Sequence, residues 1–156
     1  MRAAWRPALR RPGVLGWLRM LRITRRTERR AAQALVAWDL TYAQFDVLAQ
    51  VSADEGLSQQ ALAARLLVTQ GNITQLLDKL EQRDLVRRSR VGRTNHVMLT
   101  DKSRPFVREV VAAHEAWITT HMSGLSHTEQ RALLRLLTKL DHAQRDAHAP
   151  PWADQN

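Results

Sequence analysis

The spacing of apolar residues along the chain predicts a succession of amphipathic helices. In the stretch 14–38, apolar residues fall on one side of a single long helix, with arginines between them. A second helix is expected to begin at Thr41, because Thr41 and Gln44 have the spacing of a capping box. Leu40 and Phe45 add a hydrophobic staple at the same point. The pattern therefore favours a mainly α chain.

Two shorter helices follow, each preceded by a hydroxyl residue. Ser58 and Thr69 are placed as N-caps of two helices. The first is expected to end near Leu66 or Leu67 and the second at Gln82 or Arg83. Two helices joined by such a short turn have the spacing of a helix-turn-helix. The polar face of the second helix carries amides and hydroxyls, which suit base edges and phosphates. We interpret this second helix as one that reads DNA.

A small β-hairpin is predicted directly after these helices. Residues 85–90 and 96–100 alternate apolar and polar positions on either side of Gly92. A basic hairpin after a helix-turn-helix is a wing, and an arginine at its tip suits the narrow minor groove. The fold class is then α with a small β-wing, and 41–100 is the DNA-binding module. The side chains expected to contact DNA are Thr69, Gln70, Gly71, Asn72, Thr74, Gln75, Lys79, Arg88, Arg90 and Arg93.

The last helices are predicted over 103–147. Pro105 is acceptable in a first turn, and Ser126 with Glu129 forms a capping box for the final helix. The apolar stripes of 14–38 and 103–147 exceed what the central module can cover, so we expect them to pair two copies of the chain. The organisation predicted is a basic, disordered arm at 1–12, a regulator domain at 13–149 and a disordered tail at 150–156.

Charge strengthens the nucleic-acid interpretation. Of the net charge of +9, residues 1–40 contribute +8, with ten arginines against two acidic residues. A second basic cluster lies between Arg83 and Arg93. Such clusters favour a polyanionic partner, although a merely solvated surface is the alternative.

Other chemistries find little support. The chain has no cysteine, which excludes disulfides and thiolate metal sites, and His114 and His121 lack ligand-spaced partners, so neither metal nor cofactor is expected. Ser58 and Ser126 are explained as N-caps, so no enzyme is predicted. No apolar run reaches membrane length and no secretory signal is recognised, so we expect a protein of the bacterial or archaeal cytosol, associated with the nucleoid.

The order and spacing of several motifs resemble the multiple-antibiotic-resistance regulator (MarR) family. The motifs are Leu40-Thr41, Gln44-Phe45, Leu57-Ser58, Ala61-Leu62-Ala63, Val68-Thr69, Leu76-Leu77-Asp78-Lys79-Leu80-Glu81, Leu85-Val86, Arg93 and Leu99-Thr100. The resemblance implies a dimeric winged-helix repressor of a pseudopalindromic operator, with recognition helix 70–83 and wing-tip Arg93. The sequence departs from the family at Val91, where an acidic brace for the wing arginine is common, and at Asp84, where many members have glycine.

The resemblance also implies a small aromatic or phenolic effector. This chain resembles urate-responsive members of the family, which have a tryptophan, an aspartate, a basic residue and a wing arginine. The corresponding residues here would be Trp17, Asp46, Lys79 and Arg93. Asp46 facing solvent or pairing with an arginine is the simpler interpretation of that residue. Trp38 and Trp117 lie on apolar stripes and are assigned to the core or to a dimer interface.

Two other functions remain open at this stage. A constitutive architectural or RNA-binding protein would use the basic N-terminal segment as its main contact. Binding to an anionic membrane surface would use Leu15, Trp17, Leu18 and Leu21, although no membrane partner is predicted. Preference for one DNA sequence separates a regulator from the constitutive nucleic-acid-binding protein, and failure to bind acidic vesicles at physiological salt would exclude the membrane-surface alternative.

Overall fold

The computed structural model describes residues 11–145. The chain divides after His114 into two compact units, and each is considered by itself. The elements are α1 (Pro12–Leu35), the 3-10 helix η2 (Val36–Trp38), α2 (Tyr42–Ala53), β1 (Leu57–Ser58), α3 (Gln59–Arg65), α4 (Gln70–Gln82), β2 (Val86–Val91), β3 (Thr94–Leu99), α5 (Arg104–His121) and α6 (His127–Arg145). None of the described helices is long and apolar enough to cross a membrane.

Helices α2 and α3 begin directly after the hydroxyl residues that were predicted to cap them. The Thr41 hydroxyl accepts from the Gln44 N–H at 3.2 Å, and the Gln44 side chain accepts from the Thr41 N–H at 3.0 Å, which confirms the capping box. Ser58 accepts from the Ala61 N–H at 3.0 Å. These bonds satisfy N–H groups that the first turn of a helix leaves unpaired.

Three helix ends place a residue other than glycine in the left-handed region. Asp39, Leu67 and Asp84 have φ angles of 53°, 54° and 55°. At Leu67 the N–H bonds to the Ala64 carbonyl at 3.3 Å, and the next N–H, of Val68, bonds to the Ala63 carbonyl at 3.0 Å. This Schellman pattern ends α3, and the same pattern ends α4 at Asp84. The aspartate found in place of the family's glycine therefore still forms a left-handed helix end.

The strands form a three-stranded antiparallel sheet in the order β1-β3-β2. The hairpin of β2 and β3 confirms the predicted wing, with Val86 opposite Leu99 and Val91 opposite Thr94. The two-residue strand β1, which pairs Leu57 with Val97, was not predicted from the sequence. Two residues are too few to show the alternation that identifies a strand.

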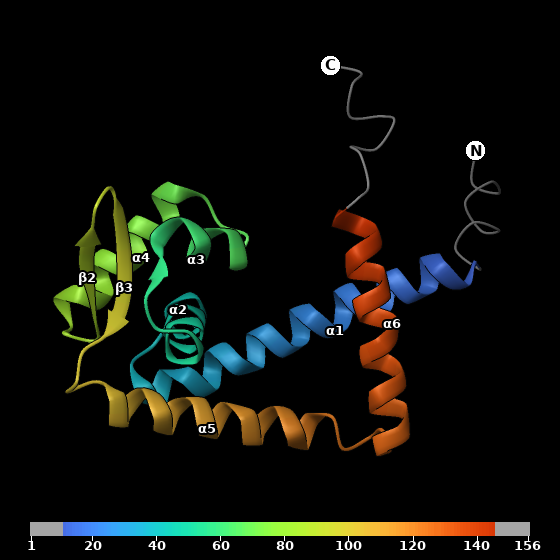
Figure 1. Cartoon of the computed structure of the whole chain (residues 1–156). Helices are drawn as coiled ribbons and strands as arrows, with labels where there is room; N and C mark the ends of the chain where they lie inside the picture. Colours follow the sequence, from blue (N-terminus) through green and yellow to red (C-terminus); the bar gives the residue numbers. More distant parts are fainter. Residues whose placement is uncertain (1–10, 146–156) are drawn as a thin grey trace, which may run out of the picture. The chain divides into compact units, whose positions relative to one another are not determined.

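One core supports the DNA-binding module. Figure 1 shows α2, α3 and α4 gathered beside the β2–β3 hairpin. Among the residues that are fully buried at the centre are Leu48, Leu62, Ile73, Leu77 and Val97, which come from α2, α3, α4 and β3. Because α4 supplies its apolar side to this core, its polar side is fixed towards solvent.

Helix α1 begins earlier than predicted. The arm was expected to reach residue 12, but Arg11 is the N-cap and Pro12 the first helical residue, since the fixed φ of proline suits the first turn. Its end also differs, because Trp38 belongs to η2 and packs edge-on against Phe106, with ring centroids 5.9 Å apart. The predictions for 1–10 and 150–156 lie outside the described residues.

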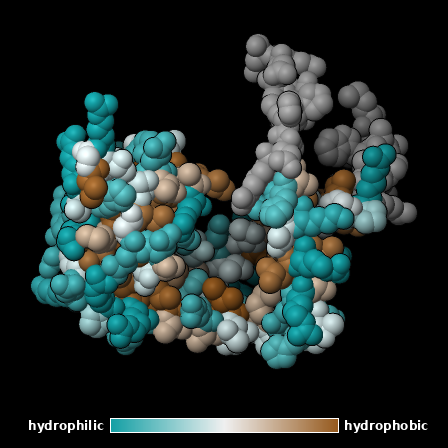
Figure 2. Space-filling model, viewed as in Figure 1, coloured by the Kyte–Doolittle hydropathy of each residue, from teal (hydrophilic) through white to brown (hydrophobic). Residues whose placement is uncertain are grey.

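Long apolar stretches of the terminal helices are exposed. In α1 only Ala31 and Leu35 are buried, and Trp17 is 48% exposed. In α6, Leu134 is 67% exposed, and Figure 2 shows hydrophobic side chains on that helix among hydrophilic ones. Ser126 caps α6 together with Glu129, as the sequence predicted. Neither helix buries its whole apolar side within its own unit.

Candidate nucleic-acid interface

Helix α4, which was expected to be the recognition helix, is held to α3 at its first turns. Gln59 of α3 donates from its side-chain nitrogen to the Thr74 hydroxyl at 2.7 Å, and that hydroxyl donates to the Gln70 carbonyl at 2.8 Å. Thr69 uses its hydroxyl to cap α4 through the Asn72 N–H at 3.2 Å. Thr69 and Thr74 were predicted to contact DNA, but in the structure their hydroxyls position the helix.

The solvent side of α4 is free of carboxylates over its first two turns. Gln70, Asn72, Gln75 and Lys79 are exposed, and no acidic residue lies in the first turn. Gly71 is exposed as well, and without a side chain it leaves the backbone at the start of the helix accessible. Exposed amides can donate to and accept from base edges, and a helix N-terminus favours an anion.

The two carboxylates in the second half of α4 are neutralised by Arg88 of β2. Its guanidinium lies 2.5 Å from both Asp78 and Glu81, and its backbone N–H donates to Glu81 at 2.7 Å. The hydrogen bond to Glu81 raises the pKa of Arg88 above its usual value. Arg88 was predicted to contact DNA, but its side chain is only 23% exposed and is occupied by these partners. The sequence pattern could not show this, since pairing between α4 and β2 depends on how they pack.

The wing presents its arginines around a tight tip. Gly92 has a φ of 62°, and the Arg90 side chain donates to the Gly92 carbonyl at 3.2 Å. Arg93 is exposed and makes no hydrogen bond or ion pair within residues 11–145. Val91, at the position where an acidic brace is common in the family, is also exposed. Arg93 is therefore free to reach a groove or a phosphate.

The structure does not bring the four expected effector residues together. Asp46 of α2 faces Glu28 of α1, and Trp17 lies 11 residues earlier in α1, about 16 Å along the helix. Arg93 is at the wing tip. Burial and the charge of Glu28 raise the pKa of Asp46 to about 6. These four residue types are common, and their occurrence in the sequence does not indicate how far apart the side chains lie in the fold.

Lys79 lines a pocket of about 430 Å³. It lies between the start of α2 and the second half of α4, and its lining includes Thr41, Gln44 and Arg83. Arg83 donates to the Asp39 carbonyl at 2.6 Å, which ties α4 to the segment before α2. No cluster of three or more metal-ligating side chains occurs in the described part of the chain.

Comparisons with known proteins agree with this geometry. The model of the MarR family matches residues 38–94. An uncharacterized HTH-type transcriptional regulator of Bacillus cereus is 33% identical over 129 residues, which cover 82% of this chain and 88% of the relative. The crystal structure of the Staphylococcus aureus MepR–DNA complex has a TM-score of 0.72 and 27% identity, with 82% of this chain and 95% of that chain covered. The transcriptional regulator BldR of Sulfolobus solfataricus has a TM-score of 0.74 and 28% identity, covering 84% and 95%. The chain belongs to the MarR family of winged-helix, DNA-binding transcriptional regulators.

Proposed function

We propose that this protein is a homodimeric repressor that binds a pseudopalindromic operator in double-stranded DNA. The observation that carries the proposal is the first half of α4, which exposes Gln70, Asn72 and Gln75 with no free carboxylate beside them. Amides in this position can read base edges in the major groove, while Arg90 and Arg93 of the wing contact the flanking DNA. A dimer bound at an operator would block access to an overlapping promoter.

We further propose release by a small aromatic acid. Support comes from the pocket lined by Lys79 and Arg83. Arg83 is paired there with Asp39, so Lys79, which forms no ion pair within residues 11–145, is the cation left to attract an anionic ligand. A ligand bound between α2 and α4 would stabilise one position of the recognition helix over others. The effector thereby alters the spacing of the two recognition helices of a dimer.

Replacing the exposed amides is expected to reduce discrimination between DNA sequences. Asn72→Ala and Gln75→Ala should each weaken binding to an operator selected from a random library about five-fold, or about 1 kcal/mol, with little change on random duplex. Arg93→Ala is the matched control: it should weaken binding to both DNAs and lower the salt slope by about 0.9. Titration by fluorescence anisotropy measures these affinities and salt slopes. Repeating the titration of the wild-type protein in the presence of benzoate tests whether an aromatic acid releases the DNA.

Equal losses on both DNAs for the amide variants would refute base reading by α4. A wild-type protein with no preferred sequence would instead indicate a constitutive architectural protein.

Sedimentation at micromolar concentration is expected to give about 36 kDa, twice the chain mass of 17.9 kDa. Two recognition helices at a fixed separation are needed for half-sites about one helical turn apart. Replacing Leu134 and Leu137, both exposed on α6, by glutamate should give monomers, whereas Arg135→Gln should not. A monomeric wild-type protein would contradict the operator model.

A further inference from the structure

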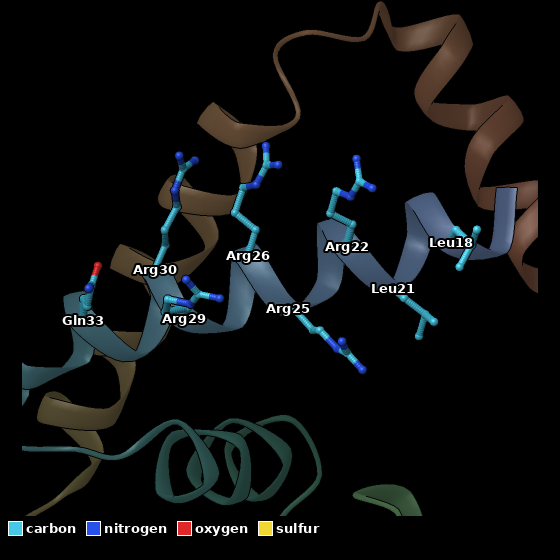
Figure 3. A pocket seen from close by; sticks show the side chains of 8 residues that line it. All are labelled: Leu18, Leu21, Arg22, Arg25, Arg26, Arg29, Arg30 and Gln33. Atoms are coloured by element: carbon cyan, nitrogen blue, oxygen red, sulfur yellow. The ribbon is translucent and has the colours of Figure 1, made fainter. Parts of the chain in front are cut away.

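We propose that an arginine groove on α1 is a second binding surface for the phosphate backbone of DNA. The groove has a volume of about 690 Å³, and its basic lining consists of Arg22, Arg25, Arg26, Arg29 and Arg30. This inference rests on the proposed DNA-binding function and adds a contact outside the recognition helix and the wing. Figure 3 shows Arg22, Arg26 and Arg30 projecting from the same side of the helix.

The five guanidinium groups are not neutralised within the described part of the chain. All five side chains are exposed, and none forms an ion pair there. Glu28 is the one acidic residue of α1. Its charge acts on α2 instead, where it raises the pKa of Asp46 and of Tyr42. The groove is therefore a concentrated positive surface without an internal counter-charge.

The spacing of the arginines matches an extended anion. Arg22, Arg26 and Arg30 are four residues apart, so each follows the last by about 6 Å along the helix axis. The row spans about 12 Å, over which one strand of a duplex presents three or four phosphates at about 3.4 Å per charge along the axis. Arg25 and Arg29 form a second row on the same groove.

Two other occupants fit the groove less well. All of its lining residues come from α1 alone, so nothing encloses a small ligand. Seven of the fifteen acidic residues are already in ion pairs in the described part of the chain, which reduces the counter-charge that a second copy could offer: Asp39, Asp54, Glu55, Asp78, Glu81, Asp84 and Asp101. Helix α6 carries four basic residues against two acidic ones, so it does not complement the groove either. Charge complementarity thus favours a nucleic acid.

The test compares three variants of the full chain on a random-sequence 40-bp duplex, which requires no operator. One variant replaces Arg22, Arg26 and Arg30 by glutamine, and a second replaces them by lysine. A third removes the same charge elsewhere by replacing the exposed Arg108, Arg131 and Arg135 with glutamine. The slope of log affinity against log salt is measured for each, with the oligomeric state followed by sedimentation.

We expect the glutamine variant of the groove to lose about 2.7 of the salt slope, at about 0.9 per released counterion, while the lysine variant keeps it. The remote variant should change the slope by much less. Arg26→Gln alone provides the same test at about a third of the effect if the triple variant does not fold.

An unchanged slope in the glutamine variant overturns the proposal. So does an equal fall in the remote variant, which would indicate a general charge effect, or a changed oligomeric state, which would indicate a second copy in the groove. Because random DNA is the probe, this result is independent of whether Asn72 and Gln75 read an operator. The two proposals can therefore fail separately.

Discussion

Replacing Arg88 by methionine is expected to lower the free energy of unfolding by about 2 kcal/mol. The change leaves Asp78 and Glu81 without their shared cation while Glu81 is only 30% exposed. For a chain of this size the melting temperature should fall by about 6 °C, measured by circular dichroism. The same change places two unpaired carboxylates on the recognition helix, so affinity for operator and for random DNA should fall together.

Arg87→Met is the matched control for Arg88. Arg87 is the exposed neighbour on the same strand and has no ion pair within residues 11–145, so its removal should leave stability unchanged. Combining Arg88→Met with Asp78→Asn and Glu81→Gln should recover most of the lost stability, since no charge is then left unpaired. If Arg88→Met kept full stability and lowered the salt slope by about 0.9, Arg88 would instead be a phosphate contact.

Asp46→Asn is expected to stabilise the protein at pH 7. The folded-state pKa of Asp46 is raised from 3.8 to about 6 by burial and by Glu28, so the folded state binds a proton more tightly than the unfolded state. The contribution of Asp46 to stability therefore falls as pH rises from about 4 to 6 and stays low above that range. After allowance for solvent screening of this half-buried group, the asparagine variant should gain about 1 to 2 kcal/mol at pH 7.

The gain should disappear at pH 4, where the carboxyl of Asp46 is protonated in the folded state. Urea unfolding at pH 4, 5, 6 and 7 measures this trend. Glu28→Gln should give a smaller gain with the same pH dependence, because Glu28 is the second cause of the raised pKa. A loss of stability in Asp46→Asn at pH 7 would show that the ionised carboxylate has a favourable partner.

Local sequence determined most of the elements of this fold. Hydroxyl N-caps and apolar spacing marked where α2, α3, α4 and α6 begin, because these signals act within a few residues. Alternation around Gly92 identified the wing for the same reason. The exposed amides of α4 were also predicted, since the side of a helix that lacks apolar residues is the one left in solvent.

The tertiary structure decided which polar side chains are available. In the sequence, Arg88 cannot be distinguished from the other wing arginines, but in the structure Asp78 and Glu81 of α4 lie beside it. Likewise Thr74 is occupied by Gln59 from the neighbouring helix, and Trp17 lies too far along α1 to meet Asp46. Residue type and spacing along one helix do not specify which side chains meet from different elements. Those pairings follow from how the apolar sides of the helices and strands share one core.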